Sequence, residues 1–229
     1  MFYIIILLQF QHLVNRLECL KNDKNVMSSD IICLQETSCN KGTVPKIPGY
    51  HYYSSGHGPN RGVGVFVKNF VLKNEKYEYV IEKNEEFAQF LVLSFSSFNV
   101  ITVYRTHQCK GKQFEEQFIH TLLDLIDKNK QTIINGDFNF DYWDEQDRSL
   151  KDKLRHAGFI QIVQEPTTVR GKCIDHFYIP SSESNFHYKL YYPYYADHEA
   201  IMVMVEGRKK RPTRTQIRRQ MKVKNKTKK

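Results

Sequence analysis

A series of short apolar runs, rich in Ile, Val, Phe and Tyr, is the feature that most limits how this chain can fold. Runs of this kind, bounded by Gly, Asn, Ser and Asp, predict strands. The expected strands span residues 2–9, 31–34, 62–68, 76–82, 87–96, 98–105, 132–134, 159–164, 173–179, 188–192 and 200–206. Helical spacing is confined to residues 11–21, 113–128 and 149–157. A loop rich in Gly, Pro and Ser is expected from residue 38 to about 61, and the whole predicts a strand-rich α/β domain.

Charge divides the chain into two parts. Residues 207–229 hold 12 of the 34 Lys and Arg and no acid, which leaves 22 basic and 25 acidic residues, a formal charge of −3, in residues 1–206. A block of like charge with few apolar residues cannot bury enough surface to fold, so we expect a domain over 1–206 and a disordered basic tail over 207–229. The tail's most basic run is Arg208, Lys209, Lys210 and Arg211. Such a run is typical of a nuclear-import signal or a contact with nucleic-acid phosphates, and a solvated tail or linker is the alternative.

The cysteines and the N-terminal segment indicate the compartment. Five Cys, an odd number without a Cys-x-x-Cys pair, indicate reduced thiols in place of a disulfide framework or a zinc site. The apolar residues 2–8 are too few to cross a bilayer. No basic residue precedes them and no small-residue cleavage site follows, so a signal peptide is not expected. We therefore expect an intracellular protein without a membrane partner, and the tail favours the nucleus.

Acidic and polar residues recur at the ends of the predicted strands. Glu36 follows the run 31–34, and Asp197 precedes the run 200–206. If such ends meet at one rim of a sheet, their carboxylates can hold a divalent cation and a phosphate together. Hard oxygen ligands of this type suit Mg²⁺, although either acid alone is more commonly a surface residue.

Asp137 and Asn139 follow the run 132–134 and flank Phe138. In an extended segment the two polar side chains point the same way, and Phe138 points into the core. Asp137 would then orient or deprotonate an attacking water, and Asn139 would donate to a phosphoryl group. A simple turn is the alternative, because Asn-Gly-Asp and Asn-Phe-Asp are turn-prone.

Asp175 lies on the apolar face of the predicted strand 173–179 and needs a partner there, because an unpaired buried charge is costly. His198 is the best candidate, since a buried carboxylate favours a charged imidazole. The charged ring would stabilise the phosphorane or protonate the leaving oxygen, unless the pair is purely structural. His176 lies on the opposite face and is not expected to act. Tyr104 and Arg105 end another strand, where a phenol and a guanidinium would bind phosphate; core packing of Tyr104 is the alternative.

Together these segments resemble the endonuclease/exonuclease/phosphatase superfamily, which includes pancreatic DNase I, exonuclease III-type repair enzymes and the endonucleases of LINE-like mobile elements. The resemblance covers residues 1 to about 206 and is carried, in order, by 31–37, 61–67, 103–105, 133–139, 173–175 and 197–198. Tyr104-Arg105, the helix after it, and Glu165-Pro166-Thr167-Thr168 followed by the Ile-Asp strand look closest to the mobile-element branch.

The resemblance implies a four-layer α/β sandwich with two central, mainly antiparallel β-sheets flanked by helices. It implies Mg²⁺-dependent cleavage of a DNA phosphodiester by in-line water attack, with Mn²⁺ as an alternative metal and RNA as an alternative substrate. Glu36, Asp197 and Gln9 would hold the metal. Asp137 would act on the attacking water, and Asn139 and Tyr104 would bind the phosphate. Asp175 and His198 would form the polarised pair. The mobile-element branch further implies a partner domain such as a reverse transcriptase or a helicase.

Gln9 departs from the family, which usually has an Asn at the end of its first strand. The longer side chain would reach past the metal, and the chain begins inside this strand, which favours an N-terminal truncation. Both features leave open a catalytically weakened relative that binds nucleic acid through its basic tail. A phosphatase or phosphodiesterase on a small phosphorylated molecule or lipid ranks lower, because the domain shows no dense Lys/Arg pocket.

Overall fold

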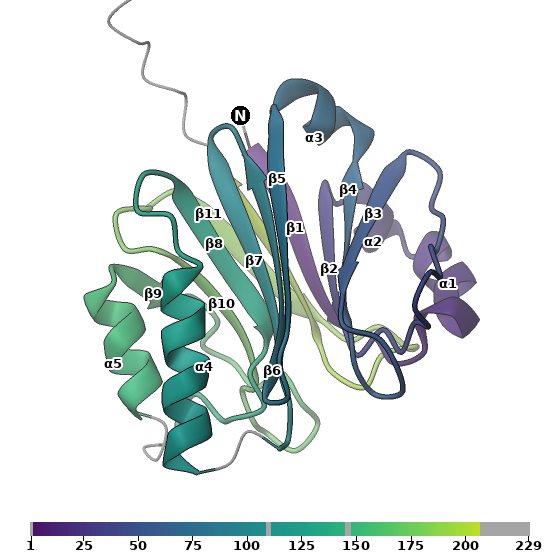
Figure 1. Ribbon diagram of the computed structural model, residues 1–229. Coiled ribbons are helices and arrows are strands. Elements are labelled where there is room, and N and C mark those ends of the chain that lie inside the picture. The colour runs from purple at the N-terminus through teal and green to yellow at the C-terminus, as the bar shows by residue number, and fades with distance from the viewer. Residues whose placement is uncertain (1, 109–110, 145–147, 207–229) are drawn as a thin grey trace, which may run out of the picture.

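The computed structural model describes residues 2–108, 111–144 and 148–206. Within these residues, two six-stranded sheets lie face to face, with helices on their outer sides (Figure 1). The predicted basic tail, with Arg208, Lys209, Lys210 and Arg211, lies outside the described residues. No described helix combines the length and hydropathy that a membrane span requires.

The first sheet has the strand order β11-β12-β1-β2-β4-β3. Its strands are β1 (Phe2–Gln9), β2 (Ile31–Gln35), β3 (Tyr50–Ser55), β4 (Val63–Lys68), β11 (Phe186–Tyr191) and β12 (Ala200–Glu206). The second sheet has the order β5-β6-β7-β8-β10-β9. Its strands are β5 (Tyr77–Asn84), β6 (Ala88–Phe95), β7 (Phe98–Arg105), β8 (Gln131–Asp137), β9 (Phe159–Gln161) and β10 (Asp175–Pro180). The pairs β1–β2 and β7–β8 are parallel and all other pairs are antiparallel.

Three apolar clusters hold four layers together. The helices are α1 (Leu13–Asn22), α2 (Lys24–Ser28), α3 (Asn69–Asn74), α4 (Lys112–Asp124) and α5 (Arg148–His156). Buried residues of α1 and α2 pack on the outer face of the first sheet, and buried residues of α4 and α5 pack on the outer face of the second. The third cluster fills the space between the sheets. The predicted four-layer sandwich with two mainly antiparallel sheets is confirmed.

The predicted loop from 38 to 61 was wrong over the strand β3, and α2 and α3 were not predicted. Strand β3 is polar and only partly buried, so its sequence lacks the apolar signal; pairing with β4 stabilises it. The short helix α2 is held by a cap, because the carboxylate of Asp23 accepts hydrogen bonds from the backbone N–H groups of Asn25 and Val26 at 2.8 and 3.3 Å. The helix predicted over 113–128 ends at Asp124.

The space between the sheets changes from apolar to polar along the strands. Alternate residues of a strand share one face, and on β1 this inner face carries Tyr3, Ile5 and Leu7 before it reaches Gln9. The same change occurs on β2, β6, β7, β8 and β10, where the inner face ends in buried polar residues. These residues are Gln35, Gln89, Tyr104, Asn135, Asp137 and Asp175. Several strands therefore end in polar groups inside the same space.

Candidate active site

Tyr104, Asp137 and Asp175 form a row across three neighbouring strands. Tyr104 on β7 is in register with Asp137 on β8, and Asp137 is in register with Asp175 on β10. All three side chains are buried, with exposed fractions of 2%, 1% and 1%. Side chains in register on one face of a sheet are direct neighbours, so the strand pairing alone brings a phenol and two carboxylates together.

Gly136 sets the spacing within this row. A Cβ atom at this position would lie 1.9 Å from the carbonyl oxygen of Val103 on the neighbouring strand, and the backbone φ angle is +148°. Only glycine tolerates such an approach of two backbones. The glycine in the Asn-Gly-Asp sequence therefore allows β8 to lie close against β7 just before Asp137.

His198 reaches the row from the segment before β12. Its Nδ1 atom lies 2.9 Å from Oδ2 of Asp175, and the side chains are 16% and 2% exposed. The two groups form an ion pair when the ring is protonated. The hydroxyl of Thr167 donates to the same oxygen at 2.7 Å. The structure thus brings together the predicted pair of Asp175 and His198, although their roles stay predictions.

Asp137 and Asn139 lie in a turn, and the prediction of a single extended segment was wrong. Strand β8 ends at Asp137, and Asn139 has a left-handed backbone with φ of 50°. The backbone N–H of Asn139 donates to Oδ1 of Asp137 at 2.8 Å, a side-chain turn that Asp favours. The side-chain amide of Asn139 donates to the carbonyl oxygen of Arg105 at 2.5 Å, which uses one of its two amide hydrogens. Phe138 is buried in the outer core of the second sheet, as predicted.

Tyr104 links the row to Glu36 on the opposite sheet. The Tyr104 hydroxyl donates to Oε1 of Glu36, which follows β2 and is 6% exposed. Glu36 has a left-handed φ of 51°, unusual for a residue with a side chain, so the chain turns sharply where β2 ends. Gln9 and Gln35 are paired in register on β1 and β2 and are also buried. The side-chain oxygen of Gln9 has no hydrogen-bond partner among the described residues.

Burial and charge shift the pKa values at the centre of the site. Burial, and then the nearby charge of Asp175, raises the pKa of Asp137 well above its ordinary value. Burial alone would lower the pKa of His198, but the contact with Asp175 and the charges of Asp137 and Asp197 outweigh it and raise this pKa to about 9. Burial, and then the bond to Glu36, raises the pKa of Tyr104, so its hydroxyl remains a neutral donor.

These residues fit a divalent cation by the chemistry of their donors. Ligand atoms of Asp137, Asp175 and His198 lie within 4.8 Å of one another. The two carboxylates are donors that divalent metals accept, whereas the charged ring of His198 has no free lone pair to give. The side-chain oxygen of Gln9 is buried without a hydrogen-bond partner among the described residues. A buried polar atom of this type needs a partner, and a metal ion would supply one. The predicted ligands Glu36 and Asp197 are not members of the compact group, although the charge of Glu36 also acts on Asp137.

Three other predicted positions have different surroundings. Asp197 is exposed, next to His198 in the chain. Arg105 is 7% exposed, and its guanidinium lies over the rings of Phe118 and Phe140 at 5.6 and 5.3 Å. The guanidinium thus packs on two aromatic rings, and its predicted contact with nucleic acid stays a prediction. His176 is buried against Phe138, and burial lowers its pKa to about 3, in agreement with a structural role.

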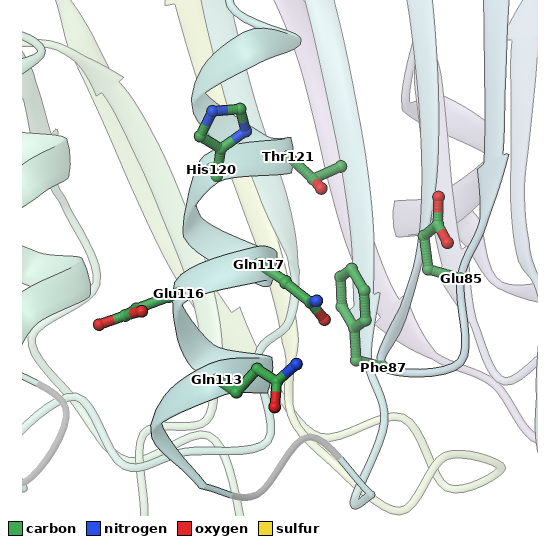
Figure 2. Close-up of a pocket in the computed structure, with 7 residues that line it drawn as sticks. All are labelled: Glu85, Phe87, Gln113, Glu116, Gln117, His120 and Thr121. Atoms are coloured by element: carbon green, nitrogen blue, oxygen red, sulfur yellow. The ribbon is translucent and has the colours of Figure 1, made fainter.

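A cavity of about 440 Å³ opens beside Glu36 and Tyr104. Its other lining residues are Gln11, Pro59, Asn60, Arg61, Thr106, His107 and Gln108. A larger hollow of about 520 Å³ lies between α4 and the segment 85–87. Figure 2 shows its lining, with Gln113 and Gln117 of α4 directed toward Phe87. It shares no residue with the row or with the cavity beside Glu36, so we place the candidate site at the smaller cavity.

Thr167, Gln35 and Arg61 lie at the site without having been predicted to act there. Thr167 contacts Asp175, Gln35 lies beside Gln9 in the strand pairing, and Arg61 lines the cavity. All three lie in segments that carry the family resemblance, but the resemblance assigned them no role. Thr167 lies in a loop, Gln35 is a neutral amide within a strand, and Arg61 precedes β4. Their roles arise from strand pairing and loop placement.

A family model described as the endonuclease/exonuclease/phosphatase family matches residues 8–198. The chain belongs to this family. Its members are hydrolytic, divalent-metal-dependent nucleases and phosphatases. The matched span contains Gln9, Glu36, the whole row and His198.

An exodeoxyribonuclease from Bacillus subtilis (strain 168) is 30% identical over an alignment of 153 residues, which covers 61% of this chain and 59% of that relative. The chain thus spans less than two thirds of the relative's length. Among solved structures, an AP endonuclease from Archaeoglobus fulgidus is similar with a TM-score of 0.67 and 17% identity, over 89% of this chain and 99% of that one. The endonuclease domain of TRAS1, a telomere-specific non-LTR retrotransposon, gives a TM-score of 0.64 and 13% identity, over 91% and 100%.

A 3′ phosphatase, NExo, from Neisseria, bound to a product DNA hairpin, gives a TM-score of 0.68 and 16% identity, over 90% of this chain and 100% of that one. At these identities the three structures show a shared fold. Proteins whose names describe nucleases and a phosphatase thus share the architecture described above.

Proposed function

We propose that this chain is a metal-dependent endonuclease that hydrolyses phosphodiester bonds in DNA by in-line attack of water. The observation that carries the proposal is the row of Tyr104, Asp137 and Asp175, extended by His198 at 2.9 Å. Asp137 is a proton acceptor, Tyr104 is a neutral hydrogen-bond donor, and the imidazole of His198 carries a positive charge. All three lie in one buried cluster. A phosphodiester needs these three functions for attack, for binding and for stabilisation of the developing charge.

Asp137 is the proposed acceptor of the proton from the attacking water. Its pKa is raised by burial, and a more basic carboxylate is a better proton acceptor near neutral pH. The bond from the backbone N–H of Asn139 to its Oδ1 holds the carboxylate in one orientation. Its Oδ2 atom is then the oxygen we assign to the water.

His198 and Tyr104 are the proposed contacts to the reacting phosphate. The raised pKa of His198 keeps the ring charged at neutral pH, so it can stabilise negative charge on the phosphoryl oxygens or give a proton to the leaving oxygen. The neutral hydroxyl of Tyr104 donates its hydrogen bond to Glu36 in this structure. When substrate binds, the hydroxyl would donate to the phosphate instead. Asn139 has a second amide hydrogen for the same phosphate.

Glu36, Asp197 and Gln9 are the residues we propose to hold the cation, with Asp137 and Asp175 nearby. When bound, Mg²⁺ or Mn²⁺ would neutralise the phosphate and polarise its bonds. Mg²⁺ keeps most of its waters and takes one or two carboxylates, which suits a site with one buried glutamate and one exposed aspartate. Gln9 would contribute its unpartnered oxygen.

The proposed substrate is DNA, and the proposed setting is a mobile element in the nucleus. The names of an exodeoxyribonuclease relative and of a DNA-bound structural neighbour support DNA, and the TRAS1 domain supports the mobile element through its fold. We further propose that the basic run at Arg208–Arg211 contacts DNA phosphates or directs import, and that a reverse transcriptase or helicase acts together with this domain.

The experiment is nicking of supercoiled plasmid, followed on gels, with Mg²⁺, with Mn²⁺ and with EDTA. The proposal predicts conversion to open circles that needs the metal and is lost in Asp137→Ala and His198→Ala. Asp152→Ala, which removes a partly exposed acid from α5, is the matched control and should leave the rate unchanged. Absence of nicking by well-folded protein with either metal would reject the proposal.

Gln9 favours one second candidate, a weakened relative that binds nucleic acid without cutting it. Its amide differs from the family's Asn by one methylene, and its oxygen is unsatisfied in this structure. This candidate predicts salt-dependent DNA binding that survives Asp137→Ala and disappears when residues 207–229 are removed. Release of inorganic phosphate from small phosphorylated substrates, without plasmid nicking, would instead indicate a phosphatase.

A further inference from the structure

We propose that Tyr194 is a stacking platform for an unpaired base of the DNA substrate, an inference that rests on the proposed function. Tyr194 lies on the segment between β11 and β12, which leads into Asp197 and His198. It is 81% exposed, more than any other large apolar side chain among the described residues. Tyrosine is enriched where proteins meet their partners, because its ring offers a large apolar face at low entropic cost.

Tyr194 occupies the outer corner of a tight turn. The backbone N–H of Ala196 donates to the carbonyl oxygen of Pro193 at 3.1 Å, so Tyr194 and Tyr195 are the two central residues of the turn. Tyr195 is only 6% exposed. The turn therefore places one ring in the core and leaves the other in solvent.

Tyr195 fixes this turn to the rest of the domain. Its hydroxyl donates to Oδ2 of Asp23 at 2.6 Å, and its carbonyl oxygen accepts from Nη1 of Arg16 at 2.7 Å. Its ring packs edge-on against Phe10, with 5.5 Å between the centroids. Because the hydroxyl, the backbone and the ring of Tyr195 are each held, the turn presents Tyr194 in one place, and less entropy is lost when a ligand binds there.

Two contacts orient the Tyr194 side chain itself. Its ring lies 5.1 Å from that of Tyr195, with an interplanar angle of 86°. Its hydroxyl interacts with the side chain of Cys19 on α1. Most of the ring nevertheless stays open to solvent, and an open aromatic face is what a nucleobase needs for stacking.

The turn lies at the rim of the proposed site. Phe10, which the ring of Tyr195 contacts, stands between Gln9, a proposed metal ligand, and Gln11, which lines the cavity of the candidate site. Two successive ring contacts, of 5.1 and 5.5 Å, therefore connect Tyr194 to the end of β1. A DNA strand bound at this cavity would extend to the tyrosine.

Stacking on Tyr194 selects the form of the DNA. In a duplex the faces of each base are covered by the neighbouring bases, so a protein ring can stack on a base only where the strand is unpaired or the base has left the stack. Every base has such a face, so the contact does not depend on which base is present. The substrate class that follows is DNA with an unpaired nucleotide near the cleaved bond.

The test is fluorescence anisotropy with a labelled single-stranded oligothymidylate and with a duplex of equal length. Both are measured in EDTA, so that cleavage does not interfere, and at a salt concentration that suppresses non-specific phosphate contacts. Tyr194→Ala removes the ring, and Tyr194→Trp keeps an aromatic face. Phe70→Ala is the matched control, because Phe70 is also an exposed aromatic residue but lies on α3, beyond the end of β4 opposite to the site.

Tyr194→Ala should weaken binding of the single strand by about 5–150-fold, the effect of one lost base stack, and should leave binding of the duplex within about twofold of the parent. Tyr194→Trp and Phe70→Ala should bind the single strand like the parent. The chain has one Trp, Trp143. In Tyr194→Trp combined with Trp143→Phe, the remaining Trp is at position 194, and its fluorescence should be quenched when the oligonucleotide binds.

Several results would overturn the inference. They are a parent that does not bind the single strand, unchanged single-strand binding in Tyr194→Ala, equal losses for single strand and duplex, a loss in Phe70→Ala as large as that in Tyr194→Ala, or unquenched Trp fluorescence. Thermal melting checks the fold of each variant. Because binding is measured without metal, Tyr194-dependent binding by a protein that does not nick plasmid would reject the proposed function alone.

Discussion

Replacing Asp175 by Asn should change the titration of His198 more than any other property of the protein. In the parent, the contact with Asp175 raises the pKa of His198 to about 9 from an ordinary 6.5, against the opposing effect of burial. One pKa unit corresponds to about 1.4 kcal/mol, so the charged ring is stabilised by roughly 3 kcal/mol net, after the cost of burial has been subtracted from the effect of the acids. Asn keeps the shape and removes the charge, while burial remains. The pKa of His198 in Asp175→Asn should therefore fall well below 9 and approach or pass 6.5.

The assay is NMR titration of the imidazole protons in metal-free protein. The chain has nine His, so a His198→Gln variant identifies the resonance. Asp152→Asn on α5 serves as the control and should not move it. Because the folded-state pKa is raised, His198 contributes stability fully below about pH 6.5 and loses it as the pH rises through about 9. A midpoint near 6.5 in the parent, or one that stays near 9 in Asp175→Asn, would refute the reasoning.

Three further variants test other parts of the site. Gln9→Asn should raise the nicking rate about 10-fold or more if the extra methylene misplaces the amide, and an unchanged rate would argue against that position at the metal. Gly136→Ala should lower the free energy of unfolding by more than about 3 kcal/mol in a denaturant titration, because its Cβ would meet a carbonyl oxygen at 1.9 Å. Gly42→Ala is the control: Gly42 also has a positive φ but has open space around it, so this change should lower the free energy of unfolding by about 1 kcal/mol. Tyr104→Phe should reduce kcat about 10-fold and lower the free energy of unfolding by about 1–3 kcal/mol, because Glu36 loses its donor, and an unchanged kcat would assign the phenol to the core.

Much of the fold could be predicted because its central strands are buried on both faces. Strands such as β1 and β12 are nearly continuous runs of apolar residues, and the sequence shows them directly. Strand β3 could not be predicted, since it is polar and partly exposed and depends on its pairing with β4. Helix α2 was missed because its five residues are too few for an apolar helical pattern, although Asp23 before it is a typical N-cap residue.

The site was predictable where its residues lie at strand ends and less so elsewhere. The strand register that aligns Tyr104, Asp137 and Asp175 follows from the pairing of three strands, which the sequence shows only as separate motifs. Arg105 was predicted from its place at a strand end, and the sequence could not show that its guanidinium packs on two Phe rings. Thr167 lies in a loop with no periodic pattern, and only tertiary structure brings its hydroxyl to Asp175.

The most direct test of the account is a double-mutant cycle between Glu36 and Asp137, which come from different sheets. Single-turnover cleavage of a duplex oligonucleotide would be measured for Glu36→Gln, Asp137→Asn and the pair. If both residues act on one phosphodiester, each single change should slow cleavage about 1000-fold or more, and the double variant should be little slower than either. Losses that multiply, or a single variant that cleaves at the parent rate, would contradict the account.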